Sequence, residues 1–209
     1  MAETSQTAAE HRSVHRGDDA DDASVIRLSR NEPERFETVF HRHAPQITRY
    51  VTRRLGPGPA EDIVAETFLL AFQQRESYDL GRPDARPWLY GIATNLIRRH
   101  VRDEVRLLRM LERTGVDPVT ESFTERVDSR ISADALSRRL AATIAGLPAK
   151  HRDVLLLLAW TELTYDQVGQ ALGVSAGTVR SRMNRTRAKL RRTLGGVDST
   201  IVREELANG

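Results

Sequence analysis

The chain has 209 residues and a net charge of only +3, with 29% charged and 5% aromatic residues, a composition that favours small helical domains over a thick sheet-based core. It contains no cysteine, which excludes disulfides, thiol catalysis and thiolate zinc sites. No apolar run approaches the roughly 20 residues that span a bilayer, and the N-terminus lacks the apolar segment of a signal peptide. We therefore expect a cytoplasmic protein that does not enter the membrane.

Residues 1–32 are polar and carry an acidic cluster, and we expect this extension to be disordered. The first domain is predicted to cover residues 33–108. Apolar side chains keep helical spacing from Phe36 to Val51, although Pro45 is expected to bend or break that helix.

Two more helices are predicted in this domain. One runs from Ala60 to about Gln74, buries an apolar face and exposes acidic residues. A loop rich in Gly, Pro and Asp follows around Tyr78–Arg86. The last helix begins near Pro87 and runs into the first of two clusters of basic residues in the chain.

Helical periodicity fades after the first domain. Residues 109–130 contain Gly, Pro and scattered acids, and they are predicted to form a flexible linker. The pattern resumes in a second domain, residues 131–195, where an apolar helix follows Pro148, and residues 196–209 form a short tail. Because no stretch sustains strand alternation, the sequence predicts an all-α fold of two small helical domains joined by a flexible linker.

Residues 163–190 predict two short helices joined by a tight turn. Thr164 begins the first helix and completes a capping box with Gln167 three residues later. Gly173 stands where a left-handed residue ends a helix, and Ser175 can cap the next one. These signals together indicate a helix-turn-helix.

The second helix of this motif has two different faces. At roughly 100° per residue, Val179, Met183 and Leu190 share one side, which is predicted to pack on the domain. The opposite side gathers guanidinium, amide and hydroxyl groups, which read base edges and bind phosphates in the major groove of DNA. The alternative is a basic helix that is merely solvated. The residues of the opposite side are Gly177, Arg180, Ser181, Asn184, Arg185 and Ala188.

Four segments carry a family resemblance: AEDIVAETFLLAF, RPWLYGIATNLIRRHVR, the LPxxxRxV run at Leu147–Val154, and LTYDQVGQALGVSAGTVRSRMNRTRAKL. In this order and spacing, over residues 33–195, the chain resembles a bacterial sigma factor of the extracytoplasmic-function (ECF) type. The resemblance implies a non-enzymatic specificity subunit of RNA polymerase, made of sigma domain two and sigma domain four. Such a subunit binds core polymerase, recognises the −10 and −35 promoter elements and melts DNA, and it needs no cofactor or metal.

The resemblance also assigns roles in the first domain. Asp62 and Glu66 lie one turn apart on the helix that docks on the clamp helices of the polymerase core. Tyr78 lies in the loop that captures a base flipped from the −10 element, and Asn95 matches the base-reading asparagine of the family. The residues implied to follow the phosphates there are Arg98, Arg99 and Arg102.

In the second domain, the resemblance implies that Arg182 and Arg187 contact phosphates beside the −35 element. The implied partners are the clamp and flap regions of core polymerase, promoter DNA, and an anti-sigma factor that the sequence does not identify. The implied readers of the −35 bases are Arg180, Ser181, Asn184 and Arg185.

Two other classes of function compete with this one. A helix-turn-helix regulator that binds duplex DNA without polymerase explains residues 131–195 equally well, but it leaves AEDIVAETF and the segment 88–102 without a role. A metal-dependent hydrolase would need His41, His43 and His100. The first two are two residues apart on a predicted helix and point to different sides, and no carboxylate completes a ligand set.

Overall fold

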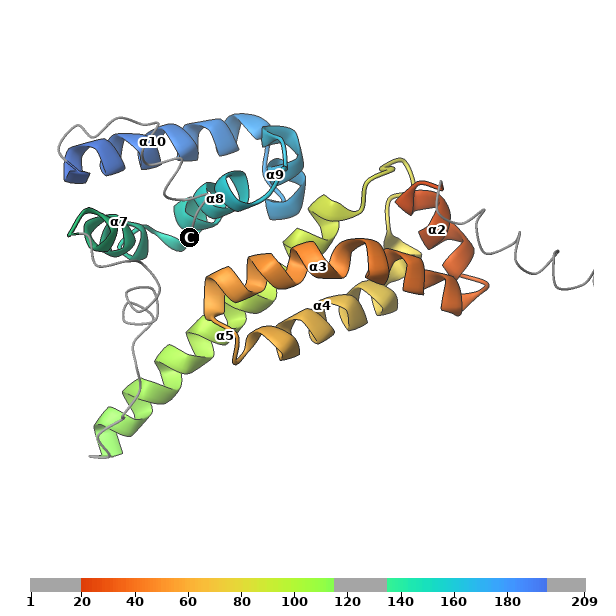
Figure 1. The fold of residues 1–209 in the computed structure, drawn as a ribbon, viewed down its shortest axis with the longest axis horizontal. Coiled ribbons are helices and arrows are strands. Elements are labelled where there is room, and N and C mark those ends of the chain that lie inside the picture. Colours follow the sequence, from red (N-terminus) through yellow and green to blue (C-terminus); the bar gives the residue numbers. More distant parts are fainter. Residues whose placement is uncertain (1–19, 115–134, 195–209) are drawn as a thin grey trace, which may run out of the picture.

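The structure is a computed structural model that describes residues 20–114 and 135–194. Every regular element in those residues is a helix, which confirms the predicted all-α fold (Figure 1). The N-terminal unit, residues 20–114, comprises α2 (Asp22–Ser29), the short 3-10 helices η2 (Pro33–Arg35) and η3 (Arg75–Ser77), α3 (Phe36–Leu55), α4 (Ala60–Gln74) and α5 (Arg86–Thr114). The C-terminal unit, residues 135–194, comprises α7 (Ala135–Ala145), α8 (Ala149–Trp160), α9 (Tyr165–Leu172) and α10 (Ala176–Leu194).

The core of the N-terminal unit lies where α3, α4 and α5 pack against one another. Val39, Ile47 and Val51 on α3 and Leu89 and Ile97 on α5 are fully buried there. Their spacing of four or eight residues places them on one face of each helix. Each such side chain contributes about 1.5–3 kcal/mol by leaving water, so this face fixes how the helices pack.

Pro45 does not break α3, which runs without interruption from Phe36 to Leu55. Pro45 itself is exposed, whereas Ile47 in the following turn is fully buried. The carbonyl that loses its helical partner at a proline therefore lies on the solvent side, where water can hydrogen-bond it. Burial of the opposite face keeps the helix continuous.

Helix α2 differs from the expectation that residues 1–32 are disordered. Val25 and Ile26 are buried against the rest of the unit. Asp21 caps the helix, because its carboxylate accepts a hydrogen bond from Ser24 N at 2.7 Å. The acidic cluster therefore begins a helix at Asp22, although the polar composition suggests a solvated tail. Residues 1–19 lie outside the described part of the chain.

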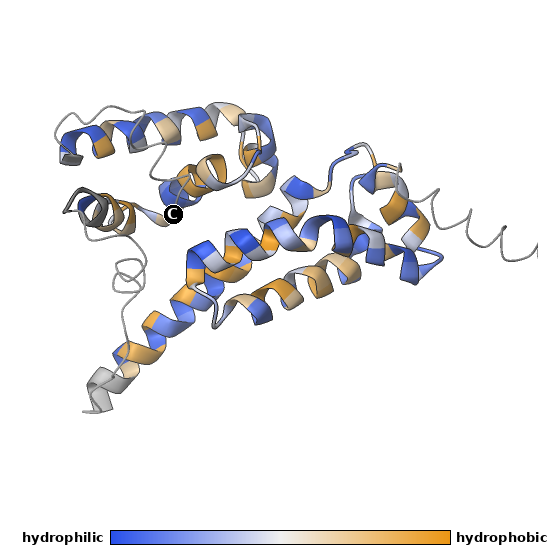
Figure 2. Ribbon diagram, in the orientation of Figure 1, coloured by the Kyte–Doolittle hydropathy of each residue, from blue (hydrophilic) through white to orange (hydrophobic). Residues whose placement is uncertain are grey.

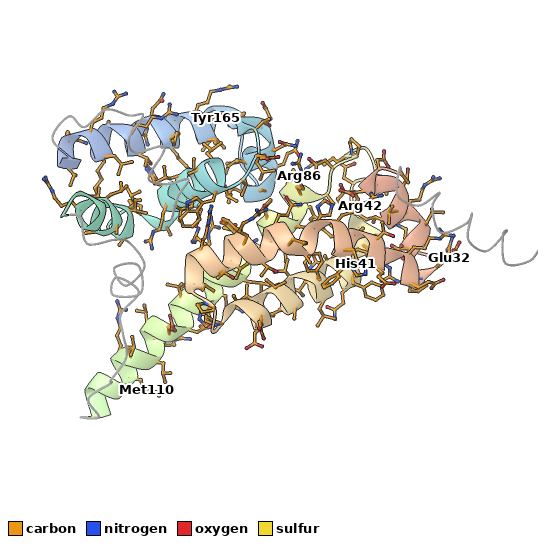
Figure 3. All side chains as sticks on the ribbon, viewed as in Figure 1. Glu32, His41, Arg42, Arg86, Met110 and Tyr165 are labelled. Carbon is orange, nitrogen blue, oxygen red and sulfur yellow. The ribbon has the colours of Figure 1, made fainter. Side chains whose placement is uncertain are left out.

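Helix α5 continues to Thr114, beyond the predicted domain boundary at residue 108. Its last turns project from the body of the N-terminal unit, and Met110 is labelled near that end (Figures 1 and 3). The first residues of the predicted linker 109–130 are thus helical. The remainder of the linker, from 115 on, and the tail 196–209 lie outside the described residues.

The C-terminal unit is built around α8, whose Val154, Leu155 and Leu157 are buried. Its α9 begins with the predicted capping box of Thr164 and ends at a glycine with φ +64°. Short turns then allow α10 to cross both α8 and α9. Across the two described stretches, no helix is both long enough and apolar enough to cross a membrane.

Candidate nucleic-acid interface

The outward face of α10 carries the residues that were predicted to contact DNA. Val179 and Thr186 are fully buried and Met183 and Leu190 nearly so, which sets the rotation of α10 about its own axis. Of the six predicted contact residues, five are exposed and one is half-buried, and Figure 2 shows α10 as largely hydrophilic. The exposed ones are Arg180, Ser181, Asn184, Arg185 and Arg187, and the half-buried one is Arg182.

The turn before α10 fixes where this face begins. The Ser175 hydroxyl accepts a hydrogen bond from the backbone of the first turn of α10, at 3.2 Å. Gly169 lets the turn approach α9, since a Cβ there would lie 2.7 Å from the carbonyl oxygen of Val174. The Arg180 guanidinium lies 5.9 Å from the ring centroid of Tyr165, which is labelled in Figure 3. The first arginine of the face is therefore placed by an aromatic ring of α9.

The electrostatics of this face suit an anionic partner. His151 of α8 lies close to it, and its pKa is lowered first by burial and then by repulsion from Arg182 and Arg185. Burial alone would lower this pKa, but the contributions of the arginines add to it because positive charge opposes protonation of the imidazole, so the local potential beside this face is positive. Such a field attracts the phosphates of a nucleic acid.

Tyr78 lies in the loop that the resemblance assigns to capture of a flipped base, but its ring is not open to solvent. Its side chain is only 6% exposed and its ring packs on Trp88, with centroids 4.8 Å apart. The hydroxyl donates a hydrogen bond to the carbonyl oxygen of Arg82 at 2.7 Å, and burial raises the pKa of the phenol. Tyr78 therefore shapes the loop between η3 and α5, and in this arrangement no unpaired base can stack on its ring.

The predicted DNA-contacting residues of α5 lie along one side of the helix. Asn95, Arg99 and Arg102 are exposed and Arg98 is half-buried. The Arg98 guanidinium donates to the Asn95 amide oxygen at 3.3 Å, so these two side chains are coupled.

Two residues predicted for different partners meet in the structure. Glu66 on α4, predicted to face polymerase, forms an ion pair with Arg99 on α5, predicted to follow phosphates. Asp62 on α4 is exposed. Leu69, one turn beyond Glu66, is 54% exposed, which leaves an apolar side chain beside the acidic ones.

Comparison with known proteins identifies both units. The family model of Sigma-70 region 2 matches residues 39–107, and that of Sigma-70 region 4 matches residues 143–192. The ECF RNA polymerase sigma factor SigL of Mycobacterium tuberculosis is 34% identical over 82% of this chain and 96% of its own length. SigW of Bacillus subtilis, another ECF sigma factor, is 30% identical over 81% of this chain and 94% of its own.

The chain is an ECF sigma factor. A further relative, SigE of Mycolicibacterium smegmatis, is 33% identical over 75% of this chain. The chain spans only 60% of the length of that protein.

Two solved structures share the fold of this sigma factor. One is CnrH in complex with the cytosolic domain of CnrY, with 22% identity, a TM-score of 0.58, and coverage of 85% of this chain and 99% of that one. The other is RpoE in complex with the anti-sigma factor NepR from Bartonella quintana, with 20% identity, a TM-score of 0.56, and coverage of 78% and 98%. At this level of identity, the likeness concerns the fold alone.

The two units of the sigma factor contact each other through a buried carboxylate. Asp153 on α8 is 1% exposed and lies between Arg54 on α3, at 2.9 Å, and Arg98 on α5, at 2.7 Å. No pattern in the sequence assigns a role to Arg54 or Asp153. Residues 55 positions apart leave no local signal of pairing.

A second contact joins α5 to α9. Gly91 on α5 lies so close to α9 that a Cβ there would be 2.6 Å from the carbonyl oxygen of Ala171. Next to it, the Gln167 side-chain amide donates to Asp84 at 2.8 Å, and Arg86 lies 3.8 Å from Glu162. Figure 3 labels Arg86 at the start of α5, beside the C-terminal unit.

The histidines that a hydrolase would require are used otherwise. His41 is exposed and pairs with Glu37 at 3.0 Å, while His43 is buried and donates to Asp22 at 2.8 Å. Within the stretches that the structure describes, no group of three or more His, Cys, Asp or Glu side chains has the arrangement of a metal site.

Proposed function

We propose that this sigma factor binds core RNA polymerase in the cytoplasm and directs it to promoters through two contacts, with α10 at the −35 element and α5 at the −10 element. The observation that carries the proposal is a pair of exposed basic helix faces, each in a unit matched by a different sigma family model. The chain contributes specificity and no catalytic step. A regulator that acts without polymerase accounts only for residues 143–192.

At the −35 element, α10 enters the major groove with its exposed face toward the bases. Arg180 and Arg185 can each donate two hydrogen bonds to a guanine edge, and Asn184 can pair with an adenine edge. Arg182 and Arg187 lie beside these residues and contact phosphates, which position the helix without reading sequence. Ser181 supplies a short hydroxyl where the helix approaches the bases most closely.

At the −10 element, the side of α5 that carries Asn95 receives the unpaired strand. Extracting a base from the duplex costs a few kcal/mol, which hydrogen bonds to the base edge must offset. The Asn95 amide supplies these hydrogen bonds, and the exposed Arg99 and Arg102 neutralise phosphates beside it. Arg98 joins them when its pairing with Asp153 is released.

Helix α4 supplies the surface for core polymerase. Asp62 offers an exposed carboxylate, and Leu69 adds apolar area on the same helix. Glu66 is shared between Arg99 and a basic group of the polymerase, because one carboxylate can accept hydrogen bonds from two cations. Core docking and the −10 contact are therefore adjacent and share this ion pair.

Besides core polymerase and promoter DNA, we propose an anti-sigma factor as a partner of this chain. The RpoE structure, which shares the fold, contains the anti-sigma factor NepR.

Run-off transcription with purified core polymerase tests this function, on a promoter found by mapping transcript starts after overexpression. The proposal expects a transcript that starts at one position only when the chain is added. A chain that shifts the duplex by itself and gives no such transcript with core polymerase would instead be a regulator of the helix-turn-helix class.

A further inference from the structure

Helix α2 precedes the segment matched by the region 2 model, which begins at residue 39. It packs on α3, η2 and η3. Figure 1 shows it at the end of the N-terminal unit from which the loop to α5 starts. This loop, residues 78–85, joins η3 to α5 and contacts α2 at both ends.

The start of α2 contacts the last part of the loop through one residue. The Asp22 backbone N–H donates to the carbonyl oxygen of Pro83 at 3.0 Å. In return, the N–H of Ala85 donates to the Asp22 carboxylate at 2.9 Å. This reciprocal pair fixes the loop where it enters α5.

The end of α2 contacts the beginning of the loop. The Arg30 guanidinium donates to the carbonyl oxygens of Tyr78, at 3.3 Å, and Arg75, at 3.4 Å. The Arg75 guanidinium donates back to the carbonyl oxygen of Ser29 at 3.1 Å. Helix α2 and its C-cap residue Arg30 therefore hold both ends of the loop.

The Asp22 carboxylate is itself held in place from α3. It accepts hydrogen bonds from His43 at 2.8 Å and from Arg42 at 3.2 Å, and the residue is only 7% exposed. Arg42 is labelled beside α2 in Figure 3. A buried carboxylate with three donors cannot move without leaving a buried charge unpaired. The loop is thus anchored to the rigid core of the unit through Asp22.

Between its two anchored ends, the loop exposes a short tip. Gly81, Arg82 and Pro83 are exposed, and the turn is closed by Asp79, whose carboxylate accepts from Arg82 Nε at 2.9 Å. A loop that is already ordered loses less conformational entropy when it binds a partner.

We propose that α2 positions this loop for promoter melting, with Asp22 and Arg30 as positioning residues that touch no DNA themselves. The inference rests on the proposed role of α5 at the −10 element, because this loop leads directly into α5. If either end of the loop is released from α2, the loop becomes ordered only while the DNA opens, and the entropy that it loses adds to the cost of unpairing the duplex. Variants that release the loop should therefore be defective only in opening duplex promoters.

The test uses Asp22→Asn, with Asp21→Asn as its matched control, in the full chain reconstituted with core polymerase. Both substitutions remove one negative charge from the start of α2. Asn at position 21 preserves the helix cap, because the side chain there accepts from Ser24 N, whereas Asn at 22 has one side-chain acceptor for three donors. We expect open-complex formation on a duplex promoter to fall roughly tenfold for Asp22→Asn only, the scale of one hydrogen bond to a charged group.

Three further measurements separate positioning from folding. A premelted promoter should be used equally well by both variants, and so should a −35 duplex probe. Hydrogen exchange of the peptide spanning residues 78–85 should speed up in Asp22→Asn and stay unchanged in Asp21→Asn. Arg30→Ala provides a second test from the other end of the loop, with the exposed Arg27 on the same helix changed to Ala as its control.

Two outcomes overturn the inference. One is a loss of transcription by Asp22→Asn that is equal on duplex and premelted templates, which indicates a folding fault. The other is normal opening by both Asp22→Asn and Arg30→Ala. Asn95→Ala shows which proposal has failed. If Asn95→Ala selectively impairs duplex opening while the α2 variants do not, only the role of α2 is wrong. If Asn95→Ala has no such effect either, the proposed function of α5 is wrong.

Discussion

The Arg98 guanidinium on α5 donates to the buried Asp153 carboxylate on α8, with Nε 2.7 Å from Oδ2. This pair joins a residue proposed to follow promoter phosphates to the unit proposed to read the −35 element. While Asp153 accepts from Arg98, the same guanidinium nitrogen cannot donate to a phosphate. The contact between the units therefore occupies the Nε–H of a side chain that is also proposed to contact DNA, and it leaves the other N–H groups of that guanidinium as the donors for a phosphate.

The two units are expected to separate when the sigma factor joins polymerase on a promoter. Elements at −10 and −35 are about 25 base pairs apart, or about 85 Å of duplex at about 3.4 Å per base pair. Units in contact through Asp153 cannot reach both. Because the chain has no cysteine, Gln73→Cys on α4 and Ala142→Cys on α7 permit specific dye pairs. Energy transfer should be high in the free protein and low in the promoter complex, and equal transfer in the two states would contradict this expectation.

Gly91→Ala should loosen the contact between the units without unfolding either one. The new Cβ would lie 2.6 Å from the backbone oxygen of Ala171, so α9 has to move away, while Ala favours the helix itself. Gly58→Ala is the matched control, because its Cβ would meet nothing within 4 Å. The same dye pair should report lower energy transfer in free Gly91→Ala, with unchanged circular dichroism. A value equal to that of Gly58→Ala would show that α5 and α9 do not pack closely in solution.

Asn95→Ala should impair opening of a duplex promoter more than use of a premelted one. The Asn95 amide is proposed to offset the cost of extracting a base, a cost that a premelted template has already met. Permanganate footprinting of unpaired thymines on both templates measures the difference. Equal losses on the two templates would indicate damage to the fold of α5.

Asp22 is expected to make stability depend on pH at the acidic end of the range. Burial opposes its ionisation, but hydrogen bonds from His43 and the Ala85 N–H, with support from Arg42, outweigh burial and lower the pKa of this carboxyl. A lowered folded-state pKa gives stability that is present above the ordinary value of about 3.9 and is lost as pH falls through the folded value.

Urea unfolding of wild type and Asp22→Asn between pH 7 and pH 3 checks this dependence. At neutral pH the wild type should be more stable by roughly 1–3 kcal/mol, the cost of leaving buried donors unsatisfied. The gap should narrow as pH falls below about 4, because the carboxyl then takes up a proton in the unfolded chain, and it should go on narrowing until pH passes the lower pKa of the folded state. A gap of constant size over the whole range would mean that the Asp22 charge contributes nothing.

Local patterns in the sequence predict the parts of the fold that local interactions determine. The capping box of Thr164 and Gln167, the left-handed Gly173 and the buried face of α10 all follow from spacing, and the structure has each of them. Composition conceals α2, although a capping Asp21 followed by the apolar pair Val25 and Ile26 is a sufficient signal of a short helix.

Contacts between distant residues could not be predicted in this way. Asp153 reads as an ordinary polar residue of an apolar helix, and its burial follows only from the placement of Arg54 and Arg98 around it. Similarly, Tyr78 is buried because Trp88 and the loop backbone surround it, and neither neighbour is implied by its place in the sequence. The candidate site residues themselves could be predicted from the sequence, but which of them pair with one another depends on tertiary structure.

The most direct measurement is transcription by the reconstituted holoenzyme, in which substitutions of the proposed base-contacting residues are combined with changes in the −35 or the −10 element. Arg185→Ala is expected to lose roughly 1–3 kcal/mol on the native promoter, and this loss should vanish when the contacted −35 base pair is replaced. When the −10 element is changed instead, Arg185→Ala should still cause its full loss of transcription. Asn95→Ala should behave in the opposite way, with a loss that vanishes on the changed −10 element and persists on the changed −35 element. Losses that are the same on every promoter would contradict the account, because residues that contact only phosphates, or only the fold, carry no information about sequence.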